Sequence, residues 1–238
     1  SNINSNTKFI LFIIILLLAL LLDDDLVIQN LKFNFFRDIE LQSFSIFFTL
    51  ISMMLFINAI NMFDGLNLQV GSYIIFIIGI FIFNNILVNM NILILMPIII
   101  YLILNYKNKI FLGDSGTHLL GYYTSYIFIK SYNYENIFVA EDIFLLMLIP
   151  GLDLFRLFIH RIYDGKNPFS ADRNHLHHLM LDRFNSFKAY LSIFVLIISL
   201  YLLSSIFPTI YLIILGTLIY VVMTFLLLYF RKKISVKG

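Results

Sequence analysis

The chain has 238 residues, of which 61% are hydrophobic and only 13% are charged, whereas a soluble domain is about half apolar and about a quarter charged. That excess excludes an ordinary soluble domain, and the net charge of +2 gives no indication of nucleic-acid binding. The absence of Cys excludes disulfides and thiolate metal sites.

Eight apolar segments follow one another along the chain. Runs of about 20 apolar residues match the hydrocarbon thickness of a bilayer, where only helices and closed barrels satisfy their own backbone groups. The runs are continuous rather than alternating, so they predict an all-α, polytopic membrane protein with a single membrane-embedded domain over residues 1–238. The predicted helices cover residues 8–22, 43–62, 70–88, 92–106, 117–133, 143–160, 189–207 and 209–230.

Lys and Arg predict the orientation of these helices, because both are enriched in cytoplasmic loops near helix ends. If the first helix starts inside, 13 of the 16 Lys and Arg residues fall on the inner side, and only Lys32, Arg37 and Lys130 fall outside. Both termini are therefore expected in the cytoplasm, with the basic run at residues 231–233 as a stop-transfer anchor.

The outer side receives the segment between the first two predicted helices. Asp23, Asp24 and Asp25 indicate a solvated outer turn. Residues 26–42 partly alternate apolar and polar side chains, which predicts a small hairpin or an interfacial strand.

The first polar motif lies at the inner end of the second predicted helix. Asn58, Asn61 and Asp64 recur at a spacing of three, which places them near one face if the helix persists, and Gly65 permits a sharp exit. A carboxylate at a membrane edge is costly unless it is paired, solvated or bound to a cation, which favours a functional role. Helix capping by Asn and Asp explains the same residues equally well.

The second motif, Phe111-Leu112-Gly113-Asp114-Ser115-Gly116-Thr117-His118, opens the fifth predicted helix. Two glycines around a carboxylate and hydroxyls indicate a tight loop with exposed backbone N–H groups, which suits a phosphate or a hard cation. The alternative is that Asp114 only caps the helix.

The third motif, NPFSADRNHLHH, covers residues 167–178 in the long inner loop. Its guanidinium and imidazoles can donate hydrogen bonds to a pyrophosphate, and Arg can do so bidentately. These side chains belong to Arg173, His175, His177 and His178. A zinc site is disfavoured because the chain has no Cys and no obvious fourth ligand. A solvated loop that happens to contain His is the other alternative.

Together the three motifs present carboxylates, amides, imidazoles and a guanidinium on one side of the membrane. Phosphoryl transfer to another phosphate brings negative charges together, so the catalyst must screen them with a metal and fixed cations. In order and helix spacing, NAINMFDGLN, FLGDSG and NPFSADRNHLHH resemble the motifs of the polyprenyl-phosphate N-acetylhexosamine-1-phosphate transferases. The third motif looks closer to the undecaprenyl-phosphate GlcNAc-1-phosphate transferase branch than to the muramyl-pentapeptide branch.

This resemblance implies an Mg²⁺-dependent enzyme of the bacterial cytoplasmic membrane, with its active face in the cytoplasm, that initiates a cell-envelope glycan. N-acetylhexosamine-1-phosphate would move from a UDP-N-acetylhexosamine to undecaprenyl phosphate, and UMP would leave. The lipid acceptor would approach sideways from the bilayer between helices. Mn²⁺ could replace Mg²⁺, and the enzyme could form a homodimer.

The resemblance also implies residue roles by motif position. Asp114 and Asn61 would be metal ligands, and Asp64 would be a further ligand or a catalytic carboxylate alongside Asp114. The other motif residues would contact substrate, with Asn58 shaping the site and Phe111 near the uridine. Phosphate or sugar groups would be held by Arg173, His175, His177 and His178.

Two features depart from the family pattern. The family has an adjacent Asp-Asp pair at the inner end of an earlier helix, but one crossing separates Asp23–Asp25 from Asp64. We therefore expect about 30 Å of hydrocarbon between them. Asn67, expected to contact substrate, stands where many relatives carry Asp, and its uncharged carbonyl predicts altered metal affinity or donor choice.

The opening SNINSNTKF resembles the stretch that follows the family's Asp-Asp pair. About three further helices are then expected upstream, each needing about 20 residues. On this interpretation the chain as given has little or no transferase activity, and a version that carries those helices is active.

Two other functions remain as alternatives. A transporter predicts charged or helix-breaking positions near mid-helix, whereas the segments here are almost uniformly apolar. An inactive paralogue or membrane scaffold would keep the motifs without the chemistry, and it would bind UDP-sugar without releasing UMP.

Overall fold

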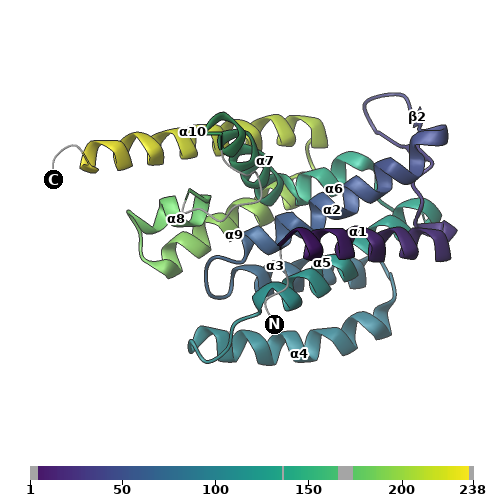
Figure 1. The fold of residues 1–238 in the computed structure, drawn as a ribbon, viewed down its shortest axis with the longest axis horizontal. Coiled ribbons are helices and arrows are strands. Elements are labelled where there is room, and N and C mark those ends of the chain that lie inside the picture. The colour runs from purple at the N-terminus through teal and green to yellow at the C-terminus, as the bar shows by residue number, and fades with distance from the viewer. Residues whose placement is uncertain (1–4, 136, 166–173, 236–238) are drawn as a thin grey trace.

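The computed structural model describes residues 5–135, 137–165 and 174–235, which are almost wholly helical (Figure 1). The α-helices are α1 Ser5–Leu22, α2 Ser45–Phe63, α3 Gln69–Phe83, α4 Val88–Tyr106, α5 Gly113–Lys130, α6 Ala140–Leu146, α7 Leu148–Tyr163, α8 Leu176–Leu181, α9 Ser186–Leu203 and α10 Thr209–Ser235. Each of the eight predicted apolar segments is helical over most of its length. The segment predicted at 143–160 is divided between α6 and α7.

The pairing of α2 with α5 brings two of the sequence motifs together. Gly121 of α5 lies against the backbone of α2, because a Cβ added there would be 3.1 Å from Ile57 Cα. A glycine at a helix crossing lets two membrane helices approach closely. The two helices share more contacts than any other pair in the described chain. One turn from this crossing, Asn61 of α2 meets Thr117 of α5.

Helix α3 lies inside the bundle rather than at its edge. Its side chains Tyr73, Ile74, Ile77 and Phe81 are fully buried, and α3 packs against α4, α5 and α9. Close packing of this kind stabilises membrane helices against one another through van der Waals contacts, because lipid tails are as apolar as the side chains that they would replace.

A bend separates α6 from α7 within the segment predicted as one helix over 143–160. The two helices meet at Met147 with an angle of 75°. Pro150 has no N–H to donate to Leu146, so the regular hydrogen-bond pattern breaks in the first turn of α7. The freed Leu146 carbonyl accepts a hydrogen bond of 3.0 Å from the hydroxyl of buried Tyr73, which stabilises the bend.

The end of the bundle that holds β2 carries the predicted hairpin (Figure 1). Strands β1 Asn30–Leu31 and β2 Ile39–Glu40 pair antiparallel. Short helical turns flank them: η1 Asp24–Leu26, η2 Gln42–Phe44 and the π-helical η3 Ser131–Glu135. The Tyr132 hydroxyl donates to the Asn30 carbonyl at 2.8 Å, and the Ala140 N–H donates to the Lys32 carbonyl at 2.9 Å. The hairpin expected over 26–42 is confirmed.

Four of the described helical spans are long and apolar enough to cross a membrane, and the count is five if α6 and α7 form one bent span. Those four are 42–63, 88–106, 186–203 and 209–231. The predicted number of eight is not confirmed. Helix α3 has only 15 residues, and α5 opens with the polar second motif rather than with apolar residues.

Candidate active site

The first motif forms the end of α2, which continues to Phe63 with Asp64 as its C-cap. The continuous helix keeps Asn58, Asn61 and Asp64 near one face, as their spacing predicts. The Asn61 amide donates to Thr117 Oγ1 at 2.7 Å and lies 3.3 Å from Asp114 Oδ1. The Asn58 amide instead donates to the Met54 carbonyl of its own helix at 2.8 Å. Asn61 is therefore the residue that joins the first motif to the second.

The carboxyl groups of Asp64 and Asp114 interact with each other. Burial, together with the nearby negative charge of Asp114, raises the pKa of Asp64 to about 6. Two carboxylates that repel each other at a helix boundary form a place where a cation is stabilised.

Asp114 is held by the first turn of α5. The Thr117 hydroxyl lies 3.2 Å from the Gly113 carbonyl and 3.0 Å from the Asp114 carbonyl, which fixes this turn. Gly113 has φ +64°, a left-handed conformation that favours glycine. Phe111, expected near a uridine, lies in the preceding loop with 73% of its surface exposed.

The loop after Asp64 is fixed by two asparagines near the end of α4. Leu68 has φ 72° and its N–H donates to Asn105 Oδ1 at 2.7 Å, while the Asn105 amide donates to the Ile110 carbonyl at 2.9 Å. Asn67 donates to Asn108 Oδ1 at 2.5 Å. Asn105 was missed in the sequence, although a polar residue near the inner end of an apolar helix is the signal that could have identified it.

Asn105→Ala is expected to lower the free energy of unfolding by about 2 kcal/mol, because it removes two hydrogen bonds from partly buried backbone groups. Thermal unfolding in detergent would measure this loss. Asn84→Ala is the matched control, since that amide donates to the Ile80 carbonyl of its own helix at the other end of α3. Equal melting temperatures for the two variants would contradict the role of Asn105.

The third motif is described from Asn174 onward. Arg173, together with the other motif residues before Asn174, lies outside the described residues. His175 precedes α8, which contains His177 and His178. The ring centroid of His177 lies 4.3 Å from that of His178 and 5.3 Å from that of His175, so the three imidazoles form one cluster.

The His177 ring lies directly on Gly65, which follows Asp64. A Cβ on Gly65 would overlap the imidazole atoms Nε2, Cε1 and Cδ2. His177 is 5% exposed, and burial lowers its pKa to about 3, with the neighbouring His178 and His175 adding to this effect. A neutral imidazole offers one N–H donor and one lone pair. His177 therefore contributes hydrogen bonding rather than positive charge at neutral pH.

The triple aspartate lies at the opposite end of the bundle from these motifs. Asp23 accepts a hydrogen bond from the Tyr126 hydroxyl at 3.0 Å, and Lys130 Nζ lies 2.9 Å from Asp23 and 3.5 Å from Asp25. The hydrogen bond from Lys130 lowers the pKa of Asp23. Lys130 is the last residue of α5 and Asp114 lies in its first turn, about 24 Å away at 1.5 Å per residue. The triplet and Asp114 therefore lie at opposite ends of α5, and the expected separation of about 30 Å of hydrocarbon between them stays a prediction.

If the protein has the transferase activity that the resemblance implies, Asp23→Asn is expected to keep turnover within about twofold of the unaltered protein, because an ion pair near the surface contributes little and lies far from Asp114. Initial rates of UMP release by the complete gene product would test this. Lys130→Met removes the other partner and should behave in the same way. A tenfold or greater loss in either variant would contradict the assignment of this cluster to structure.

The donor set at Asp64, Asp114 and Asn61 fits Mg²⁺ better than a softer metal. Over the described ranges, no three side chains of the His, Cys, Asp or Glu type are grouped closely enough to hold a metal ion by themselves. Mg²⁺ is usually bound by one or two carboxylates, with phosphate and water oxygens completing the octahedron. Two carboxylates and one amide satisfy that requirement without a third acidic residue.

The comparisons with known proteins agree with the motifs. A family model described as Glycosyl transferase family 4 matches residues 1–132, which include the first two motifs. The decaprenyl-phosphate N-acetylglucosaminephosphotransferase of Mycobacterium leprae (strain TN) is 32% identical over 167 residues, which cover 59% of this chain and 42% of that protein.

Two further relatives show the same partial coverage. The undecaprenyl-phosphate alpha-N-acetylglucosaminyl 1-phosphate transferase of Escherichia coli (strain K12) is 29% identical over 150 residues, which cover 58% of this chain and 41% of the relative. The protein of the same name from Yersinia pestis is 30% identical over 146 residues, which cover 56% and 40%. In each of these three alignments the matched part is about two fifths of the relative's length.

Proposed function

Because the chain belongs to glycosyl transferase family 4, we propose that it carries the catalytic centre of a membrane enzyme that transfers N-acetylhexosamine-1-phosphate from a UDP-N-acetylhexosamine to undecaprenyl phosphate. The observation that carries this proposal is the meeting of Asn61, Asp64 and Asp114 at one end of the α2–α5 pair. These residues come from two motifs more than 40 residues apart, and His177 from the third lies against the same turn.

The proposed reaction exchanges one phosphorus–oxygen bond for another. An oxygen of the acceptor phosphate bonds to the β-phosphorus of the UDP-sugar, and the bond from that phosphorus to the bridging oxygen breaks. UMP leaves with the bridging oxygen. Both reactants are anions, so the site must offset their repulsion and hold them in line.

Each of the grouped side chains has a part in this scheme. Asp64 and Asp114 would hold Mg²⁺ with the Asn61 amide, and Mn²⁺ takes a similar oxygen set. A bound divalent ion supplies neutralisation of the charge that develops on the phosphate oxygens. His177 donates or accepts one hydrogen bond beside the reacting phosphates, because its ring is neutral and fixed on Gly65.

On the same grounds we propose the polyprenyl acceptor and the inner-membrane location. The long apolar helices leave large exposed apolar side chains on α4 and α10, consistent with lipid around the bundle. A cytoplasmic position for the end of the bundle that holds Asp64 is supported by the excess of Lys and Arg in the loops predicted on that side. A homodimer remains a proposal from the family resemblance.

Turnover of the complete gene product with radiolabelled UDP-GlcNAc or UDP-GalNAc, undecaprenyl phosphate and Mg²⁺ tests the proposal. We expect label in the lipid phase, one UMP released per sugar phosphate transferred, and loss of both signals with a chelator. Binding of the UDP-sugar without release of UMP, under conditions where an authentic relative turns over, would instead favour an inactive paralogue.

A further inference from the structure

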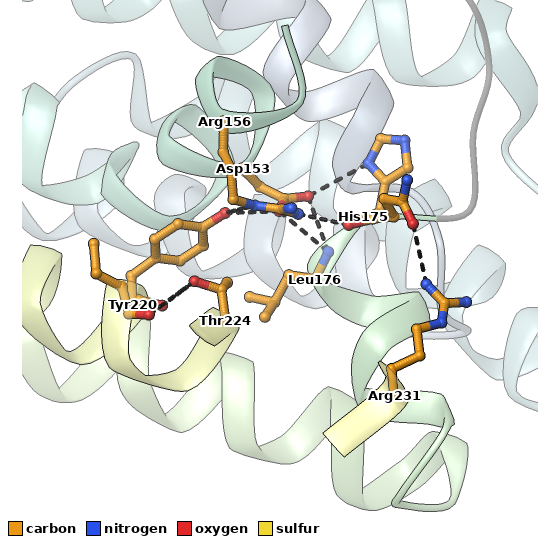
Figure 2. A network of polar contacts seen from close by, with 9 residues as sticks. Asp153, Arg156, His175, Leu176, Tyr220, Thr224 and Arg231 are labelled. Atoms are coloured by element: carbon orange, nitrogen blue, oxygen red, sulfur yellow. Dashed lines mark hydrogen bonds and ion pairs between the residues drawn. The ribbon is translucent and has the colours of Figure 1, made fainter. Parts of the chain in front are cut away.

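A buried polar network lies beside the histidine cluster and includes residues that none of the three motifs contains. Figure 2 shows Asp153 and Arg156 of α7 and Tyr220 of α10 converging on the chain at His175 and Leu176. Asp153 is 7% exposed. Its carboxylate accepts hydrogen bonds from Arg156 Nη2 at 2.8 Å and from the Tyr220 hydroxyl at 2.8 Å.

The same carboxylate holds the backbone at the start of α8. The Leu176 N–H lies 3.1 Å from Asp153 Oδ1 and 3.2 Å from Oδ2, and His175 Nδ1 lies 3.4 Å from Oδ2. Arg156 adds a second hydrogen bond to this stretch of backbone, because its Nη2 also donates to the Asn174 carbonyl at 2.6 Å. Two residues of α7 thus hold the backbone of the third motif at Asn174 and at Leu176, on either side of His175.

Helix α10 supports this arrangement from the other side. The Tyr220 hydroxyl accepts from Arg156 Nε at 2.8 Å while it donates to Asp153. Further along α10, Arg231 Nη1 donates to the Asn174 side-chain oxygen at 3.1 Å. The histidine segment is therefore held between α7 and α10.

Burying this network costs free energy of hydration, which indicates that it has a role other than stability. A buried carboxylate and a partly buried guanidinium lose hydration, and well-packed apolar side chains often give equal stability in their place. An apolar core cannot supply a directed hydrogen bond to a backbone N–H. Leu176 immediately precedes His177, whose ring lies on Gly65 beside Asp64. The hydrogen bond from the Leu176 N–H to Asp153 is thus one residue away from His177, whose side chain reaches the proposed catalytic centre.

We propose that Asp153 is a positioning residue, which acts with Arg156 and Tyr220 to keep the His175–His178 segment in the place where His177 covers Gly65. Only the predicted effect on turnover rests on the proposed function. The placement itself is a property of the protein without substrate.

Hydrogen exchange of the full chain in detergent, followed by mass spectrometry, measures that placement directly. Asp153→Asn removes the charge and Tyr220→Phe removes only the hydroxyl that supports the carboxylate. Both are expected to speed exchange in peptides covering residues 174–181 by about fivefold or more, while peptides from α9 stay unchanged. Thr224→Val is the matched control, because the Thr224 hydroxyl lies one turn along α10 and donates to carbonyls of its own helix.

Turnover of the complete gene product provides the second measurement. If Asp153 positions His177, kcat per folded protein falls about tenfold in Tyr220→Phe while KM for the UDP-sugar changes little. Unchanged exchange at 174–181 in Tyr220→Phe, or equal acceleration in Thr224→Val, would overturn the proposal even if Asp153→Asn fails to fold. Absence of UMP release by the unaltered protein would count against the proposed function alone, since the exchange result does not depend on it.

Discussion

Asp64→Asn is expected to lower turnover by about 10³-fold while making the protein more stable. Loss of a group that stabilises charge in a transition state costs about 10²–10³-fold in related settings, and loss of an ion ligand adds to this effect. The increase in stability has a separate cause. Burial raises the pKa of Asp64 to about 6, so the folded state disfavours the charged form. An amide of the same shape removes that cost.

The pH dependence of this gain has a definite sign. Because the folded pKa lies above the model value of 3.8, ionisation of Asp64 costs stability fully above pH about 6 and not at all well below pH about 4. Asp64→Asn should therefore unfold with a free energy about 1 kcal/mol higher at pH 8, after allowance for the partial exposure of the carboxyl. The difference should disappear as the pH falls through this window.

Thermal unfolding at pH 8 and pH 4 in detergent, combined with UMP release by the complete gene product, would measure both effects. Asp23→Asn is the matched control, because it changes an aspartate at the opposite end of the bundle. A less stable Asp64→Asn protein at pH 8 would contradict the burial argument. Full activity in that variant would show that Asp64 is not part of the proposed catalytic centre.

Gly65→Ala is the second substitution with a large expected effect, a loss of about 10²-fold in turnover. Gly65 does not have a positive φ, so glycine is needed there for space rather than for backbone freedom. A methyl group would overlap the ring of His177, and the buried imidazole would have to move off Gly65. Misplacement of a group by about 1 Å can cost about 10²-fold in rate.

Gly79→Ala is the matched control, because a Cβ at Gly79 in α3 meets nothing within 4 Å. In a helix interior, Ala is about 1 kcal/mol more favourable than Gly, so this variant should be slightly more stable and fully active. Initial rates and melting temperatures of both variants would be compared. If Gly65→Ala retained normal turnover, the contact with His177 would have no part in catalysis.

The sequence could predict the helices and the grouping of the first two motifs for simple physical reasons. Continuous apolar runs favour helices in lipid, and the spacing of Asn58, Asn61 and Asp64 holds because α2 continues to Phe63. The meeting of Asn61 with Asp114 required only that α2 and α5 be antiparallel neighbours. Their contact depends on Gly121, a small residue whose partner could not be identified from one chain.

Other features depend on contacts between residues far apart in the chain. The bend at Met147 had a local signal, since Pro150 and Gly151 interrupt the apolar run, but the Tyr73 hydroxyl that satisfies Leu146 comes from a different helix. In the sequence, Asp153 is an acidic residue in a largely apolar segment. Its structural role is seen only in the fold, where its carboxylate accepts hydrogen bonds from the Tyr220 hydroxyl and the Leu176 N–H. The neutral state of His177 likewise follows from burial that no spacing reveals.

The lengths of α3 and α4 have a consequence for how the bilayer acts on this protein. Helix α3 is short and enclosed by protein, with nine of its 15 residues buried, whereas α4 has 19 residues and only three of them buried. A thicker or thinner membrane changes the tilt of the helices that contact acyl chains, so α4 responds first. Asn105 near the end of α4 accepts a hydrogen bond from the Leu68 N–H, in the loop that follows Asp64. A change in bilayer thickness is therefore expected to reach this loop through α4.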